Sequence, residues 1–261
     1  MDNKELNRIL HASLELDREV IGVKFLDNAE EYEKESGKDI TNDMRYCVLI
    51  QSATRGHRLK IRGENFLCSG SGTTFGYHDL PDNYYSGESY LSYGLHKDLE
   101  TSKKVVNDMY IMDRTYGLVA GPLETFTENN PDVIILVTNS YNAMRLSQGY
   151  SHQFGLKKDF NIAGNQAICL ESTAVPLLEK DMNISMLCAG TRYAAGWDDD
   201  ELSIGISYEI IEPVVEGLIQ TINTIEPDEK KNKIIEKNGS DTIEGVTITK
   251  GSAYFLDKSF S

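Results

Sequence analysis

The chain has 261 residues, of which 40% are hydrophobic and 26% charged, a composition typical of a folded protein and not of a disordered or fibrous one. Its 41 Asp and Glu outnumber its 26 Lys and Arg, and the net charge of −15 disfavours binding to nucleic acid or to anionic lipid. The amino terminus has no signal-peptide core, and no apolar run approaches the roughly 18 residues that a membrane helix requires. We therefore expect a cytoplasmic protein without nucleic-acid or membrane partners.

The first half of the chain alternates helical and strand patterns. Apolar residues recur at helical spacing after the capping candidates Asp2 and Asn3, which predicts an amphipathic helix over residues 3–16. Residues 58–62 alternate basic and apolar side chains, which predicts a half-exposed strand with one basic face. The other elements expected here are a strand at 20–26, helices at 29–36, 44–54 and 97–108, and a long Tyr-rich loop at 77–96.

The second half continues the mixed pattern. Pro213 is expected in the first turn of a helix at 207–223, where proline is tolerated. Residues 226–237 are dense in charge and predict a solvated helix or linker. We predict a mixed α/β fold with one large domain over residues 1–225 and a charged carboxy-terminal extension over 226–261. The remaining elements expected are strands at 117–120, 132–137, 183–187 and 246–249, and a helix at 140–153.

The sequence around Cys68 has an echo around Cys188. Leu67-Cys68-Ser69-Gly70 aligns with Leu187-Cys188-Ala189-Gly190, and each is preceded by a cysteine in a predicted helix and then a strand. Self-similarity at long period predicts a duplicated architecture, in which residues 20–115 and 130–222 are halves related by a pseudo-twofold axis. Chance alignment of two glycine-rich loops is the alternative.

The main candidates for a functional site are the four cysteines of the chain, Cys47, Cys68, Cys169 and Cys188. A pseudo-twofold would bring equivalent loops together, and four thiolates are the ligands of an iron–sulfur cluster, of which the four-iron form is one type. Gly70 and Gly190 would let backbone N–H groups approach a bound anion or inorganic sulfide. Zinc and copper are alternatives, although the Cys-x-x-Cys spacing usual for structural zinc does not occur. Cysteines that serve only as core residues are a further alternative.

Other residues are candidates for roles beside the cysteines. Glu171 and Arg192 each lie within four residues of a cysteine and are candidates for acid, base or anion-binding chemistry. The basic strand would fit a small anion, although ion pairs with neighbouring acids are the commoner arrangement. The acidic run 198–201 is a weaker candidate for a cation site. The Tyr-rich loop is expected to form the wall of a ligand pocket or a homodimer interface.

Six short motifs occur in an order that resembles a known family. They are Arg45-Tyr46-Cys47, Glu64-Asn65-Phe66-Leu67-Cys68, Pro131-Asp132-Val133-Ile134-Ile135, Cys169-Leu170-Glu171, Cys188-Ala189-Gly190-Thr191-Arg192 and Asp199-Asp200-Glu201-Leu202. Over about residues 20–222 the chain resembles the uncharacterised prokaryotic family called domain of unknown function 169. The resemblance implies a single full-length domain and a similar pattern at all four cysteine positions. It implies no particular activity.

Three hypotheses about function follow from these patterns. The first is a cytoplasmic iron–sulfur or other thiophilic-metal protein with a redox or electron-transfer role, whose acidic surface orients a basic redox partner. In the second, the chain binds a small anionic ligand without a metal, and its cysteines are structural. In the third, it is an enzyme that uses one thiol of low pKa. The sequence leaves catalyst and carrier equally open.

Overall fold

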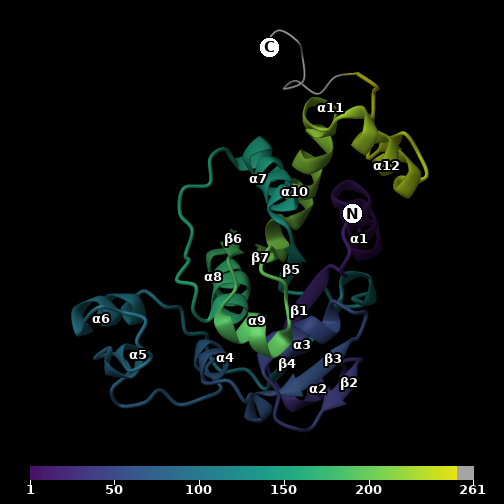
Figure 1. The fold of residues 1–261 in the computed structure, drawn as a ribbon. Helices are drawn as coiled ribbons and strands as arrows, with labels where there is room; N and C mark the ends of the chain where they lie inside the picture. The colour runs from purple at the N-terminus through teal and green to yellow at the C-terminus, as the bar shows by residue number, and fades with distance from the viewer. Residues whose placement is uncertain (252–261) are drawn as a thin grey trace.

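The structure is a computed structural model that describes residues 1–251, and its centre is a seven-stranded mixed sheet (Figure 1). The strand order is β2-β3-β4-β1-β5-β7-β6, and all neighbours are antiparallel except β2 and β3. The mixed α/β fold that the sequence predicts is confirmed. The strands are β1 (Ile21–Leu26), β2 (Lys38–Ile40), β3 (Leu59–Arg62), β4 (Gly117–Pro122), β5 (Val133–Thr138), β6 (Met182–Ser185) and β7 (Leu202–Ser207), with a separate hairpin of β8 (Thr242–Ile243) and β9 (Val246–Thr247).

Both faces of the sheet are covered, and β5 shows why. Successive strand side chains point to opposite faces, so Val133 and Ile135 enter one hydrophobic core while Ile134 and Leu136 enter the other. The helices α3 (Tyr46–Ala53), α9 (Ala189–Ala195) and the π-helix η3 (Ala167–Ala174) contribute to the first core. The helices α1 (Asn3–Leu14), α7 (Ser140–Phe154) and α10 (Tyr208–Gln220) contribute to the second. No helix within residues 1–251 combines the length and the apolarity needed to cross a membrane.

Helix starts follow the local capping signals. The side chain of Asp2 accepts a hydrogen bond from the N–H of Glu5 at the start of α1, and Asn139 does the same for Asn142 at the start of α7. The predicted helix at 3–16 is therefore found as Asn3–Leu14. The remaining helices are α2 (Ala29–Lys34), α4 (Ser69–Thr74), α5 (Glu88–Leu91), α6 (Leu99–Asn107), α8 (Val175–Glu179), α11 (Ile222–Ile225) and α12 (Asp228–Asn238), with short turns of 3₁₀-helix at η1 (Gly63–Asn65) and η2 (Leu123–Thr125).

The position expected for Pro213 was wrong. The helix α10 begins at Tyr208 with Ser207 as its cap, because β7 ends at Ser207 and the chain turns there directly into the helix. Pro213 therefore lies inside α10 and not in its first turn.

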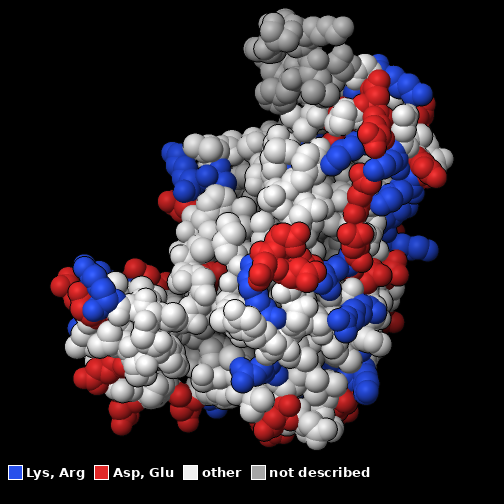
Figure 2. Space-filling model, in the orientation of Figure 1, with Lys and Arg blue, Asp and Glu red and all other residues white. Residues whose placement is uncertain are grey.

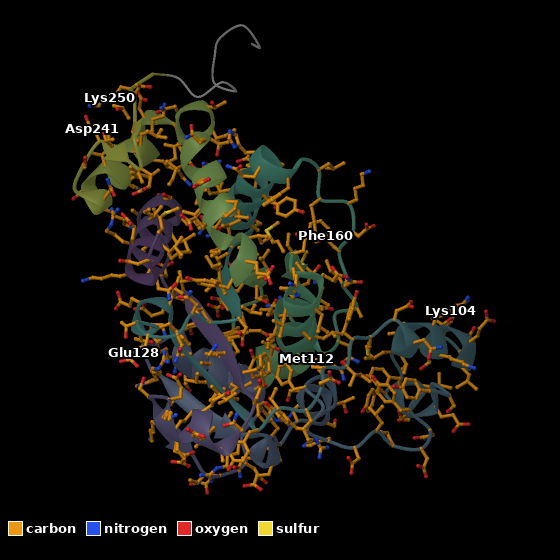
Figure 3. The ribbon with its side chains drawn as sticks, turned by 180° about the vertical axis from the view of Figure 1, so that it is seen from behind. Lys104, Met112, Glu128, Phe160, Asp241 and Lys250 are labelled. Atoms are coloured by element: carbon orange, nitrogen blue, oxygen red, sulfur yellow. The ribbon has the colours of Figure 1, made fainter. Side chains whose placement is uncertain are left out.

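The Tyr-rich loop is part of a small lobe, which we define as residues 77–107. This Tyr-rich lobe contains α5 and α6 and has its own hydrophobic cluster of Tyr84, Tyr90 and Val106. In Figure 3 the lobe, marked by Lys104, stands out from the rest of the molecule, and Met112 lies where the chain has returned to the main core. The predicted irregular loop thus contains the short helix α5 and packs against α6.

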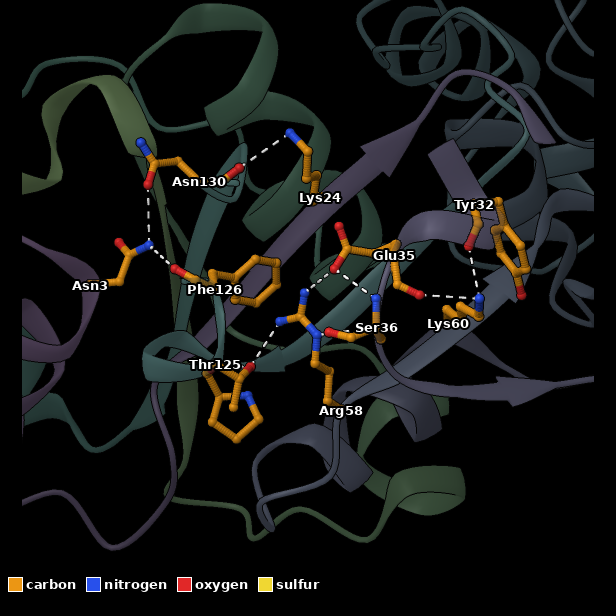
Figure 4. A network of polar contacts seen from close by, with 11 residues as sticks. Asn3, Lys24, Tyr32, Glu35, Ser36, Arg58, Lys60, Thr125, Phe126 and Asn130 are labelled. Atoms are coloured by element: carbon orange, nitrogen blue, oxygen red, sulfur yellow. Dashed lines mark hydrogen bonds and ion pairs between the residues drawn. The ribbon is translucent and has the colours of Figure 1, made fainter. Parts of the chain in front are cut away.

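The exposed basic face predicted for residues 58–62 was wrong. Lys60 is only 8% exposed and donates hydrogen bonds to the backbone carbonyls of Tyr32 and Glu35 (Figure 4). Arg58 forms an ion pair with the Glu35 carboxylate, and its guanidinium lies 3.9 Å from the centre of the Phe126 ring. The segment from α2 to Ser36 therefore covers this side of β3 and satisfies its charges, which leaves no open basic patch on the strand.

The charged segment after residue 225 contributes to the core. Glu226 is fully buried and forms an ion pair with the equally buried Arg145 of α7, at 2.6 Å. Ile234 of α12, together with Ile243 and Ile248, joins the second hydrophobic core. The expectation of a purely solvated helix or linker at 226–237 was therefore wrong, because one face of α12 is apolar and packs inward. Residues 252–261 of the predicted extension lie outside the described residues.

The two sides of the sheet have matching orders of elements. Cys47 lies in α3, which leads to β3, to Cys68 before α4 and then to β4. Cys169 lies in η3, which leads through α8 to β6, to Cys188 before α9 and then to β7. The centre of the sheet is the antiparallel pair of β1 and β5. On one side, β4 and then β3 lie next to β1; on the other side, β7 and then β6 lie next to β5. The pseudo-twofold itself stays a prediction, which superposition of the two halves would test.

Candidate functional site

The four cysteines, which come from four separate segments, line one pocket of about 340 Å³. Cys47 and Cys169 lie in the first turns of α3 and η3, whereas Cys68 and Cys188 immediately precede α4 and α9. All four are free thiols. We call this space the cysteine pocket.

Backbone contacts bring Cys47 and Cys68 to the same place. Met44 pairs with Phe66 in an isolated β-bridge, and the N–H of Leu67 donates to the carbonyl of Met44 at 3.0 Å. The segments just before α3 and just before α4 therefore run side by side, with Cys47 in the first turn of α3 and Cys68 directly before α4. On the other side of the pocket, the Cys47 thiol lies 3.9 Å from the carbonyl oxygen of Gly190, which follows Cys188.

Burial and mutual repulsion disfavour thiolates in the cysteine pocket. Burial, followed by the proximity of Cys188 and Cys68, raises the pKa of Cys47 to about 11. Burial, followed by the same two thiols, raises the pKa of Cys169 well above its usual value. The protonated thiol is therefore the stable form of Cys47 and of Cys169 in the absence of a cation. A bound metal reverses this preference, because it deprotonates the thiols that coordinate it.

The pocket-facing glycines keep space open beside two sulfurs. A Cβ atom on Gly70 would lie 3.0 Å from Cγ of Gln166 and 3.6 Å from Sγ of Cys68. A Cβ atom on Gly190 would lie 3.7 Å from Sγ of Cys188. Both residues line the cysteine pocket, and their predicted contact with a bound anion or sulfide stays a prediction.

Glu171 does not line the cysteine pocket. It is fully buried, and its carboxylate accepts hydrogen bonds from the N–H groups of Ala163 and Gly164 and from the hydroxyl of Ser185. Burial raises the pKa of Glu171, against the effect of these three hydrogen bonds. Glu171 thus fixes the loop that carries Gln166, and it also ties η3 to β6 before Cys188.

Arg192 also lies outside the lining of the pocket. Its guanidinium donates to the backbone carbonyls of Met186, Asp198 and Glu201, and so it holds the turns on either side of α9. The acidic run 198–201 does not reach the cysteines either, because Glu201 forms a two-point ion pair with Arg18.

Residues of the Tyr-rich lobe, and two residues that the sequence did not single out, complete the wall of the pocket. Tyr90, Tyr93 and Leu95 of the Tyr-rich lobe line it, which fits the prediction that this loop forms the wall of a ligand pocket. Arg45 and Gln166 also line it. The place of Arg45 next to Cys47 was a signal that could have identified it, whereas Gln166 lies in an irregular segment without a pattern.

The cysteine spacing differs from that of a single-ion site. Within residues 1–251, no three His, Cys, Asp or Glu side chains are close enough together to hold one metal ion as they stand. A tetrahedral zinc ion requires four donors around one centre. An iron–sulfur cluster takes its cysteines on different iron atoms and therefore accepts them further apart.

The fold and the pocket define a class of mixed α/β proteins in which four cysteines from two similar runs of elements face one cavity. The chain belongs to the family called domain of unknown function 169, described as uncharacterised ArCR, whose model matches residues 9–217. A curated relative, described as the uncharacterized protein MJ0308 of Methanocaldococcus jannaschii, is 28% identical over 207 residues, which cover 78% of this chain and 88% of the relative. No solved structure gives a significant match. The predicted family membership is confirmed.

Proposed function

We propose that Cys47, Cys68, Cys169 and Cys188 hold an iron–sulfur cluster, and that the protein has a redox or electron-transfer role. The observation that supports this most is that the four cysteines of the chain, although distant in sequence, line one pocket. Structural cysteines would have no reason to converge in this way, because each could be buried separately. Four cysteine thiolates are also the usual ligand set of a four-iron iron–sulfur cluster, with each cysteine on a different iron atom.

The surroundings of the thiols fit such a group. At Gly190 a Cβ atom would meet only Sγ of Cys188, at 3.7 Å, which leaves room next to this sulfur, whereas Gln166 lies close to Gly70. The hydroxyl of Thr191 lies 3.1 Å from Sγ of Cys188, and hydrogen bonds to cluster sulfurs tune the reduction potential. Arg45 would offset part of the negative charge of four thiolates. When bound, the cluster would supply one-electron redox chemistry.

The surface charge favours a basic redox partner. The net charge of −15 would attract a cationic protein, and acidic side chains form a cluster near the middle of the face seen in Figure 2. A cytoplasmic location is part of this proposal, since four free thiols are typical of a reducing compartment.

The test is anaerobic purification followed by a visible absorption spectrum and by quantification of iron, sulfide, zinc and copper. The proposal predicts iron and sulfide in stoichiometric amounts, lost in Cys68→Ser and in Cys188→Ser. Arg55→Met is the matched control, because Arg55 is exposed, lies just after α3 and does not line the pocket. Protein that is free of iron and sulfide under these conditions would contradict the proposal and favour metal-free binding of a small anion.

A further inference from the structure

A single charged side chain lines the cysteine pocket. Among the described residues around it, Arg45 is the only Lys, Arg, Asp or Glu. Its guanidinium forms no ion pair within residues 1–251, although 41 acidic residues occur in the chain. In Figure 2 the surface between the Tyr-rich lobe and α9 is mostly free of charged side chains. Arg45 is exposed and unpaired among the described residues, so its charge is available to an anion that enters the pocket.

Two amide side chains beside the cysteines have donors without partners. Gln166 is only 8% exposed and contacts Gly70, yet its side-chain amide makes no hydrogen bond within the described part of the chain. The Nδ2 atom of Asn165 is buried and likewise has no partner there. Gln166 also adopts a left-handed backbone conformation, with φ of 55°, which is uncommon for residues other than glycine. Buried donors normally have an acceptor, so the Nδ2 atom of Asn165 points to a ligand that supplies one, and the accessible amide of Gln166 offers a second donor beside it.

The opposite wall of the pocket is apolar. Tyr90 is buried, whereas Tyr93 and Leu95 are more than half exposed, and all three line the pocket. Exposed aromatic and aliphatic side chains at a pocket wall are typical of sites that bury the apolar part of a small organic ligand.

We propose that the cysteine pocket binds a small organic carboxylate beside the cysteines. Arg45 pairs with the carboxylate, the amides of Asn165 and Gln166 donate to its oxygens, and Tyr93 and Leu95 cover its apolar part. The inference rests on the proposed function and deepens it, because it names the class of molecule that lies next to the cluster. The alternative role for Arg45, compensation of thiolate charge alone, is an outcome of the test.

The test uses para-fluorobenzoate as the probe and follows its binding to the full-length, cluster-loaded protein by fluorine NMR. The neutral analogue para-fluorobenzamide should bind about tenfold more weakly, because it lacks the charge that Arg45 recognises. Arg45→Met and Gln166→Leu should each weaken benzoate binding by about tenfold. Arg55→Met is the matched control and should bind like the wild type, since Arg55 lies outside the pocket.

Three results would overturn the inference: no binding of the benzoate, equal binding of the neutral amide, or binding that Arg45→Met and Gln166→Leu leave unchanged. A shift of the cluster potential in Arg45→Met without loss of benzoate affinity would assign Arg45 to charge compensation. Iron and sulfide analysis of the same samples separates this test from that of the proposed function. If the anaerobically purified wild type contains no iron or sulfide and still binds benzoate, the carboxylate site is supported and the cluster is contradicted. Iron and sulfide without benzoate binding would support the cluster and contradict the carboxylate site.

Discussion

The hydroxyl groups of Tyr46 and Thr173 lie 2.9 Å apart in the buried space between α3 and η3. Thr173 donates its own proton to the carbonyl of Ile168 at 2.6 Å, so Tyr46 is the donor in the pair. This hydrogen bond ties together the two helices that carry Cys47 and Cys169. The relative position of those two cysteines therefore depends on a buried polar contact as well as on the hydrophobic core.

Tyr46→Phe should lower the free energy of unfolding by about 1 kcal/mol, because it removes the donor to a buried hydroxyl and leaves the ring packing intact. Urea unfolding of the metal-free protein measures the effect. Tyr85→Phe is the matched control, since the Tyr85 side chain is exposed, and its change should stay within about 0.5 kcal/mol. An equal loss in both variants would contradict a specific role for the Tyr46 hydroxyl.

Gly205→Ala should disturb the π-helix that carries Cys169. A Cβ atom at position 205 would lie 2.1 Å from the carbonyl oxygen of Ser172 in η3, so the helix must move away from β7. We expect the free energy of unfolding to fall by about 3 kcal/mol, and the iron content to fall with it. Gly190→Ala is the contrasting variant, because its Cβ meets only the Cys188 sulfur, at 3.7 Å. Its stability should be unchanged or higher by up to about 1 kcal/mol, and wild-type stability in Gly205→Ala would refute the prediction.

Asp132→Asn should be more stable than the wild type at neutral pH. Burial raises the pKa of Asp132 above its usual value of 3.8, and the hydrogen bond from the N–H of Phe25 offsets this only in part. Because the folded-state pKa is the higher one, ionisation of Asp132 lowers stability as the pH rises through that pKa. The asparagine oxygen can still accept the Phe25 hydrogen bond. The gain should therefore shrink as the pH falls toward 3.8, as measured by urea unfolding at a series of pH values.

Asp181→Asn is the control with the opposite sign. Burial is the largest single influence and would raise the pKa of Asp181. The hydrogen bond from Lys157, at 2.8 Å, the one from the N–H of Met182, the nearby Tyr150 hydroxyl and the charge of Lys157 together outweigh it, and the pKa is lowered. The wild type should therefore be more stable than Asp181→Asn at neutral pH, and it should lose this advantage as the pH falls below 3.8. If both variants were more stable than the wild type at neutral pH, or both less stable, burial and ion pairing would not act on these two carboxylates as described.

Cys47 in the metal-free protein should react slowly with iodoacetamide at neutral pH. Only the thiolate reacts, and burial, together with Cys188 and Cys68, raises the pKa of Cys47 to about 11. The rate should therefore rise by about tenfold for each pH unit below that pKa, which mass spectrometry of the Cys47 peptide can follow. A rate that reaches its plateau near neutral pH would instead favour a thiol enzyme that uses Cys47.

Local patterns predicted most of the fold. The capping candidate Asp2 and the apolar periodicity after it were sufficient for α1, since helix starts depend on neighbouring residues, and apolar periodicity alone was sufficient for α7. Apolar periodicity also predicted the helix that has Cys47 in its first turn, α3. The basic face at 58–62 was wrong because the residues that cover it, in α2 and just after it, precede β3 by more than 20 positions. The alternation of basic and apolar residues shows that the two faces of a strand differ, but it does not show which face other segments cover.

That the four cysteines lie together could be expected only from the similarity between the sequences around Cys68 and Cys188. The sequence could not place Gln166 at the pocket, because Gln166 lies in a long connection without periodicity. For the loop that contains Tyr93, it left a pocket wall and a dimer interface equally open. Glu171 was expected to be a candidate acid or base beside the thiols, but its carboxylate accepts hydrogen bonds from the N–H groups of Ala163 and Gly164. Nearness to a cysteine in sequence does not determine on which side of η3 a side chain lies.

Iron and sulfide analysis of anaerobically purified protein, with Cys68→Ser and Cys188→Ser beside the wild type, tests the central claim most directly. We expect a visible absorption band with stoichiometric iron and sulfide in the wild type, and the loss of all three in both variants. Colourless wild-type protein without iron or sulfide, or iron that persists in both variants, would contradict it.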